Sequence, residues 1–182
     1  IVKGLIESMN GSIQVESVPG EGTTFTFQLP FLLDDTACSN RKREQTAETD
    51  AAGMKILVVE DNEINMEIAE FYLTEAGAKT EKAWNGAEAV QKFAESEAGS
   101  FDAILMDVMM PVMDGLEATR RIRALEHPDA GTVTILAMTA QSSADSIHQC
   151  EQAGMNGYIA KPVEAAELIK ILSEKCPKGC KN

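Results

Sequence analysis

Apolar residues gather in five short runs in the second half of the chain, and each run is followed by a turn and a helical pattern. The runs are KILVV at 55–59, KTEKA at 79–83, FDAILM at 101–106, TVTILAM at 132–138 and GYIA at 157–160. Four of them are nearly continuous apolar stretches, which is typical of strands covered on both faces in a parallel sheet. The second run carries lysines and is more polar, which favours an edge strand that resists pairing with other chains.

Apolar spacing predicts which faces of the first and last helices turn inward. In the first helix, Ile64, Ile68 and Phe71 share one face, which we expect to pack on the core, and Gly77 ends the helix. The last helix has a comparable apolar stripe, made of Leu168, Ile171 and Leu172.

Polar residues and glycine mark the ends of the helices between the runs. Asn85 is followed three residues later by Glu88, and Asp114 by Glu117, as in near-variants of the capping box. Gly154 is placed to end the fourth helix. Strands that alternate with helices predict a compact, doubly wound α/β domain with a five-stranded parallel sheet and right-handed crossovers.

A polar segment divides the chain. Residues 34–53, DDTACSNRKREQTAETDAAG, carry many charges and no large apolar residue, so they cannot bury enough surface to offset chain entropy. We interpret them as a linker. It would join an N-terminal piece at 1–33 to a domain at 54–176, which is followed by a tail at 177–182.

The N-terminal piece has the pattern of a short helix followed by a β-hairpin. We expect a helix over 1–9, a turn at Asn10-Gly11 and strands over 12–17 and 23–29. Phe25, Phe27 and Leu29 alternate with polar residues, as on a half-buried strand. A lone hairpin and a helix of this length are each marginally stable in water.

Composition and charge exclude several classes of function. Hydrophobic residues make up 44% and charged residues 25% of the 182 residues, the balance of a globular domain, and no apolar run is long enough to span a bilayer. The net charge of -13 argues against binding to nucleic acid or to an anionic membrane, because both need a positive surface. We expect a cytoplasmic location and four reduced cysteines without a metal site.

Polar side chains stand where the predicted strands end. Ligands of open α/β sheets bind beyond the carboxyl ends of the strands, so five groups from distant positions are expected to converge there: Glu60, Asp61, Asp107, Thr139 and Lys161. Crowded carboxylates repel unless a cation joins them, and an oxygen-only site suits Mg²⁺. With a lysine opposite, such a site can neutralise a phosphoryl group in transfer.

The motifs around these residues resemble those of response-regulator receiver domains. The matching strings are VVEDNEINM at 58–66, LMDVMMPVMDG at 105–115, AMTA at 137–140 and AGMNGYIAKPV at 153–163. The resemblance covers about 120 residues in the family's order and spacing. It implies a flavodoxin-like fold with strand order 2-1-3-4-5, which places the polar run KTEKA at an edge.

The resemblance also implies roles for individual residues. Asp107 would accept the phosphoryl group, Asp61 would bind Mg²⁺ directly, and Glu60, where many members carry Asp, would hold the ion mainly through water. The backbone carbonyl of Met109 would be the remaining protein ligand. Lys161 would pair with the phosphoryl oxygens.

Further positions match the conformational switch of the family. Thr139 and Tyr158 would be the switch residues, with the hydroxyl moving towards the phosphoryl group and the ring turning inward. The bond before Pro162 would be a cis peptide. The implied partners are the phosphohistidine domain of a histidine kinase and a histidine phosphotransfer protein.

Residues 1–30 resemble the C-terminal end of the ATP-binding domain of histidine kinases. Together with the receiver-like segment, the whole chain resembles the C-terminal end of a hybrid sensor histidine kinase. The asparagine box, the nucleotide-binding glycine motifs and the phosphorylatable histidine region are missing from this piece, and we do not expect it to bind ATP productively. A receiver catalyses its own phosphorylation, so whether this chain is an enzyme is a matter of definition.

Two alternatives remain at this point. One is a protein-binding module that signals without phosphorylation, against which the complete set of five groups counts. The other is a phosphohydrolase on a similar α/β sheet, in which a second aspartate would typically stand two residues after the nucleophile. Met109 occupies that position here.

Overall fold

The computed structural model of the chain describes residues 2–8, 10–18, 20, 22–30, 51–140 and 143–176. The chain divides into two compact units, Ile1–Ala47 and Glu48–Asn182. Most of the predicted linker, at 34–50, and the predicted tail at 177–182 lie outside the described residues. Within the described part, no helix is both long enough and apolar enough to cross a membrane.

The second unit is built on a five-stranded parallel sheet, as the sequence predicted. Its strands are β3 (Lys55–Val59), β4 (Lys79–Ala83), β5 (Ala103–Asp107), β6 (Thr134–Thr139) and β7 (Gly157–Ala160). They lie in the order β4-β3-β5-β6-β7, with neighbouring strands parallel. This is the expected order 2-1-3-4-5, and the polar run KTEKA is the edge strand β4.

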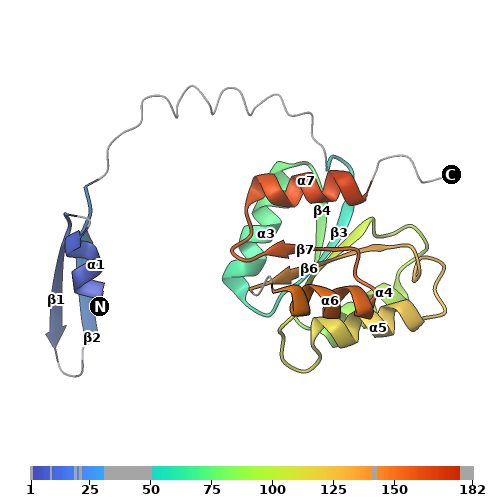
Figure 1. The fold of residues 1–182 in the computed structure, drawn as a ribbon, viewed down its shortest axis with the longest axis horizontal. Coiled ribbons are helices and arrows are strands. Elements are labelled where there is room, and N and C mark those ends of the chain that lie inside the picture. Colours follow the sequence, from blue (N-terminus) through green and yellow to red (C-terminus); the bar gives the residue numbers. More distant parts are fainter. Residues whose placement is uncertain are drawn as a thin grey trace. The chain divides into compact units, whose positions relative to one another are not determined.

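Helices cover both faces of this sheet (Figure 1). On one face lie α3 (Glu63–Glu75) and α7 (Ala165–Lys175), and on the other lie α4 (Gly86–Glu95), α5 (Gly115–Ala124) and α6 (Ala144–Ala153). Each helical layer packs on its own apolar core. Every residue of the central strand β5 is buried, which explains why its sequence is a continuous apolar run up to its last residue.

The predicted helix ends are confirmed. Asn85 Oδ1 accepts the backbone N–H of Glu88 at 3.0 Å, and Asp114 Oδ1 accepts that of Glu117 at 2.7 Å. Gly154 follows α6 with a φ of 97°, a left-handed conformation that glycine adopts without a steric cost.

The prediction for the buried face of α3 is wrong. Ile64, Ile68 and Phe71 are 67%, 40% and 61% exposed. The core contacts of α3 are made instead by the buried residues Met66, Ala69 and Leu73. At about 100° per residue the two sets lie on opposite sides of the helix, so α3 has two apolar faces, and the sequence pattern selected the one that faces outward.

The first unit contains α1 (Val2–Ser8) and the antiparallel strands β1 (Ser12–Val18) and β2 (Gly22–Gln28). The helix and hairpin agree with the predicted elements, whereas the expected half-burial holds for Leu29 and fails for Phe25 and Phe27. Phe25 and Phe27 are 65% and 62% exposed. Among the described residues of this unit, α1 packs on the hairpin and its Ile6 is buried.

The last residues of the predicted linker pack within the second unit. Ala51 is fully buried and accepts a hydrogen bond from the backbone N–H of Met54 at 3.1 Å. Gly53 donates its N–H to the carbonyl of Gly77 at 3.1 Å. The small side chain of Ala51 therefore fills a core position that a search for large apolar residues overlooks.

The start of α5 lies against the end of β5, and a glycine makes this approach possible. Gly115 donates its N–H to the carbonyl of Val108 at 3.0 Å. A methyl group at this position would overlap the carbonyl oxygen of Asp107 and lie 2.9 Å from Cγ of Met106. The absence of a side chain at Gly115 thus fixes the distance between α5 and Asp107.

We expect Gly115→Ala to lower the free energy of unfolding by about 1–3 kcal/mol, the usual cost of overpacking, because the atoms it meets belong to the central strand. Urea unfolding measures the change. Gly131→Ala is the matched control, since a methyl there meets nothing within 4 Å, and it should change stability by less than about 0.5 kcal/mol. Equal stabilities of the two variants would contradict the proposed close approach.

Candidate functional site

Each of the five predicted groups lies at the carboxyl end of a strand. Glu60 and Asp61 follow β3, Asp107 ends β5, Thr139 ends β6, and Lys161 follows β7. The parallel topology brings these ends to the same edge of the sheet.

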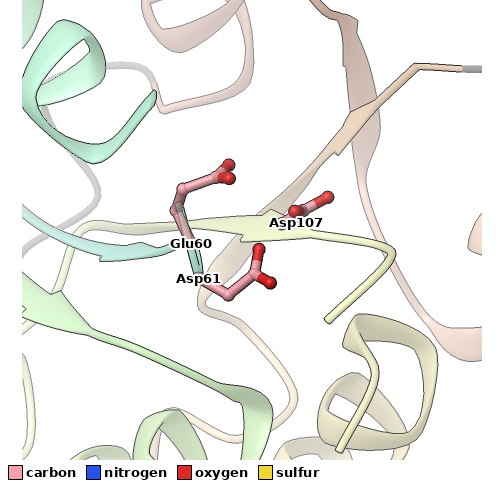
Figure 2. A group of neighbouring side chains, drawn as sticks. All are labelled: Glu60, Asp61 and Asp107. Carbon is pink, nitrogen blue, oxygen red and sulfur yellow. The ribbon is translucent and has the colours of Figure 1, made fainter. Parts of the chain in front are cut away.

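Three carboxylates converge at this edge. One oxygen from each of Glu60, Asp61 and Asp107 lies within 4.8 Å of the others, and Figure 2 shows the side chains reaching into a common space from the ends of β3 and β5. Glu60 and Asp107 are only 1% and 5% exposed, whereas Asp61 is exposed. The cluster therefore has two buried members and one that faces solvent.

Lys161 is the cation that partners the two buried carboxylates. Its Nζ lies 2.5 Å from Oε2 of Glu60 and 2.8 Å from Oδ2 of Asp107. These contacts join residues that are far apart in the sequence and tie the end of β7 to the ends of β3 and β5.

Burial and charge shift the proton affinities of this cluster. Burial raises the pKa of Asp107 above its ordinary value, the hydrogen bond from Lys161 partly offsets this effect, and the nearby charge of Glu60 adds to it. Burial alone would lower the pKa of Lys161, but its hydrogen bonds to Asp107 and Glu60 and the charges of these residues outweigh burial and leave the pKa raised. Lys161 therefore stays an ammonium at neutral pH.

Backbone hydrogen bonds fix the positions of these side chains. Glu60 donates its N–H to the carbonyl of Ala83 at 3.1 Å, and Lys161 donates its N–H to the carbonyl of Thr139 at 2.8 Å. The backbone N–H of Met109 donates to Oδ1 of Asp107 at 3.2 Å. One oxygen of Asp107 thus faces the following loop, and the other faces Lys161.

The residues that the resemblance assigned to the switch lie in the neighbouring strands β6 and β7. Thr139 is buried at the end of β6, and Tyr158 in β7 is 38% exposed. The peptide bond between Lys161 and Pro162 is cis, as the resemblance implied. The side chain of Met109 is largely exposed, in the loop that follows Asp107.

Two asparagines that the sequence analysis did not single out also belong to the site. Asn62 caps α3, because its Oδ1 accepts the backbone N–H groups of Ile64 and Asn65 at 3.0 and 3.1 Å. Asn65 donates from Nδ2 to Oε1 of Glu60 at 3.0 Å. The available signal was the position of both amides in the first turn after the acidic pair, where side chains point back towards the strand.

The donor set fits a hard divalent cation. The three carboxylates offer oxygen ligands only, and their oxygens are close enough to share one ion. A cation there would also reduce the repulsion between Asp61 and the two buried acids.

Comparisons with known proteins agree with this geometry. A family model described as the response regulator receiver domain matches residues 56–173. The chain is 30% identical to the sensory/regulatory protein RpfC of Xanthomonas campestris, in an alignment that covers 96% of this chain and 27% of that protein. The chain thus spans about a quarter of the length of this relative.

Two solved structures are similar to the second unit. The receiver domain of the sensor histidine kinase PA1611 from Pseudomonas aeruginosa, which has a magnesium ion coordinated in its active site cleft, is 41% identical with a TM-score of 0.62; the match covers 69% of this chain and 98% of that one. The receiver domain of Ssk1 from Saccharomyces cerevisiae, crystallised with the histidine phosphotransfer protein Ypd1, is 32% identical with a TM-score of 0.61; the match covers 68% of this chain and 88% of that one.

Because three carboxylates converge, we expect the removal of one negative charge to raise the melting temperature without metal and to reduce the stabilisation by Mg²⁺. Asp61→Asn keeps the shape of the side chain but removes one like charge, so we expect the melting temperature in chelator to rise by about 2–4 °C. The rise on adding Mg²⁺ should shrink, because ligand binding to the folded state contributes about 2.7 kcal/mol at a hundredfold excess over Kd and the variant binds more weakly. Thermal melts in chelator and in Mg²⁺ measure both effects.

Glu97→Gln is the matched control, because it removes one negative charge from an exposed loop and should leave the Mg²⁺-induced rise unchanged. Asn62, not Asp61, supplies the cap of α3, so lost capping should not mask the result. An Asp61→Asn protein that melts lower than the wild type in chelator would show that Asp61 has a structural role instead.

Proposed function

We propose a function from the premise that this chain belongs to the response regulator receiver family. Its second unit receives a phosphoryl group from a phosphohistidine onto Asp107 in a two-component phosphorelay, then changes conformation or passes the group to a histidine phosphotransfer protein. The observation that carries the proposal is that Asp107 contacts Lys161 and lies close to the carboxylates of Glu60 and Asp61.

The chemical step is an in-line displacement at phosphorus. A carboxylate oxygen of Asp107 forms the new P–O bond, the P–N bond of the phosphohistidine breaks, and its electron pair stays with the imidazole. The product is an acyl phosphate on Asp107. Lys161, 2.8 Å from Oδ2 of Asp107, is placed to neutralise the phosphoryl oxygens, and such positioning and electrostatics supply most of the catalysis of this reaction.

Glu60, Asp61 and Asp107, with the backbone carbonyl of Met109, are the proposed protein ligands of Mg²⁺. When bound, the ion supplies positive charge to the phosphoryl oxygens. Asp61 is the exposed carboxylate of the three, which suits direct contact with an ion that keeps some of its waters. Glu60 is buried and engaged with Lys161, which suits a contact through water.

Thr139 and Tyr158 are the proposed switch residues. The hydroxyl of Thr139 would hydrogen-bond the phosphoryl group, a contact that exists only in the phosphorylated state and therefore shifts the population of conformers. Tyr158 is 38% exposed, and its ring would turn inward when Thr139 moves.

The outward face of α3 is the proposed docking surface for the phosphohistidine partner. A donor histidine must reach Asp107 at the edge where α3 begins, so the partner has to cover the first turns of this helix. Ile64, Ile68 and Phe71 form an exposed apolar stripe there, bordered by the exposed acids Glu63 and Glu67. An apolar helical surface with a basic rim would complement it.

The N-terminal unit is proposed to be the end of a kinase ATP-binding domain, with the whole protein a hybrid sensor histidine kinase. The alignment with RpfC covers 96% of this chain and so extends through the hairpin, which supports a common arrangement. Because the phosphoryl group originates from ATP, the cytoplasm is the proposed site of action.

We expect Asp107 to be the only acceptor. Incubation with acetyl phosphate and Mg²⁺ should add the mass of one phosphoryl group, located on Asp107 by mass spectrometry and absent from Asp107→Asn. Asp114→Asn is the matched control, because it changes an aspartate in the same loop to a residue that caps a helix equally well, and it should be phosphorylated as the wild type is.

Incorporation that persists undiminished in Asp107→Asn would overturn the assignment of the acceptor. An unphosphorylated wild type would favour the binding module that signals without phosphorylation. Steady turnover of a generic phosphatase substrate would favour the phosphohydrolase.

We expect Ile68→Glu to slow phosphotransfer from a phosphorylated histidine phosphotransfer protein, with Ypd1 as the probe, by about tenfold or more. The substitution removes apolar contact area and places a charge in the centre of the apolar stripe, where docking would remove it from water. Phosphorylation by acetyl phosphate should be unchanged, because Ile68 lies on the outward face of α3 and is not one of the cluster residues. Ala94→Glu, on the exposed surface of α4, is the control; equal transfer rates for the two variants would argue against docking on α3.

A further inference from the structure

The carboxylate of Glu60 has a second partner that the set of five site residues does not include. Glu60 is 1% exposed, and each of its oxygens accepts one hydrogen bond: Oε2 from Lys161 and Oε1 from Nδ2 of Asn65, at 2.5 and 3.0 Å. A buried carboxylate needs such donors, because ionised groups lose the hydration of bulk water on burial. Asn65 and Lys161 thus hold Glu60 from two sides.

The helix cap places Asn65, and its side chain is not needed for that placement. Asn62 accepts the backbone N–H of Asn65 at 3.1 Å, which fixes this residue in the first turn of α3. Side chains on a helix tilt towards its N-terminus, so the amide of Asn65 points back to the end of β3, where Glu60 stands. Asn65 is itself an exposed residue and fills no core position.

We infer that Asn65 is a positioning residue for the metal site, acting through Glu60; this inference rests on the proposed function. Lys161 contacts both Glu60 and Asp107, and in the proposed reaction it turns to the phosphoryl oxygens. Glu60 then loses its charged partner, and Asn65 is the hydrogen-bond donor that keeps the carboxylate oriented towards the metal position. Groups of this kind, which orient a ligand from behind, strongly affect metal affinity.

The choice of an amide follows from electrostatics. A lysine or arginine at this position would also satisfy Oε1 of Glu60, but its charge would repel the cation that the three carboxylates attract. A neutral donor fixes the geometry without reducing the negative charge of the cluster. The inference therefore concerns the donor atom Nδ2 and not the charge of the residue.

Titration calorimetry with Mg²⁺ tests the inference. Asn65→Ala should raise the Kd for Mg²⁺ about tenfold, and it should also lower the melting temperature in chelator by several degrees, because it leaves Oε1 of the buried Glu60 without its donor. Phosphorylation by acetyl phosphate should need a similarly higher Mg²⁺ concentration to reach half its maximal rate, and the rate should recover at saturating Mg²⁺.

Gln91→Ala is the matched control. It removes a comparable hydrogen bond, from Nε2 of Gln91 to Oε1 of Glu95 at 2.9 Å, on the exposed surface of α4, and it should leave the Kd unchanged. A Kd within twofold of the wild type in Asn65→Ala would overturn the inference. The wild type is phosphorylated in the same set of experiments. An unchanged Kd in Asn65→Ala would therefore leave the proposed function intact, whereas a wild type that forms no acyl phosphate on Asp107 would refute the proposed function itself.

Discussion

The contact of one lysine with two buried carboxylates is the interaction on which the site depends. Lys161 meets Glu60 and Asp107 at 2.5 and 2.8 Å, and both acids are almost completely buried. Removing one partner of a buried ion pair leaves an uncompensated charge, which is strongly destabilising. The cluster therefore constrains the ends of β3, β5 and β7 to meet, and the parallel sheet is the framework that allows it.

The same cluster retains an imbalance of charge, with more carboxylates than ammonium groups, and this imbalance suits a phosphorelay. Three carboxylates face a single ammonium, and burial raises the pKa of Asp107. In the proposed reaction a divalent cation would compensate the excess negative charge, and the incoming phosphoryl group would give Lys161 a new partner. Two neighbouring residues support the positions of these acids: Asn65 donates a hydrogen bond to Glu60, and Gly115 at the start of α5 lies against Asp107.

The sequence predicted the parts of the structure that follow from local rules. Apolar runs located four of the strands, asparagine and aspartate located the helix starts, and the polar residues at the ends of these four strands located the cluster around Asp107. The errors arose where one local sequence pattern is compatible with two different packing arrangements. In α3 the large residues Ile64 and Phe71 outweighed Ala69 in the periodicity, although Ala69 is the one that packs in the core. Asn65 was missed because it is a neutral amide and does not stand at a strand end, although its position in the first turn of α3 was an available signal.

The central claim is that Lys161 exchanges Glu60 for the phosphoryl group when Asp107 is occupied. The ¹H–¹⁵N resonance of the Lys161 ammonium, in protein labelled on lysine and assigned with Lys161→Arg, tests it directly. On addition of Mg²⁺ and beryllium fluoride, a phosphoryl mimic, the account predicts a large shift of this resonance that is absent from Asp107→Asn. An unchanged Lys161 resonance, with bound fluoride visible in the ¹⁹F spectrum, would contradict it.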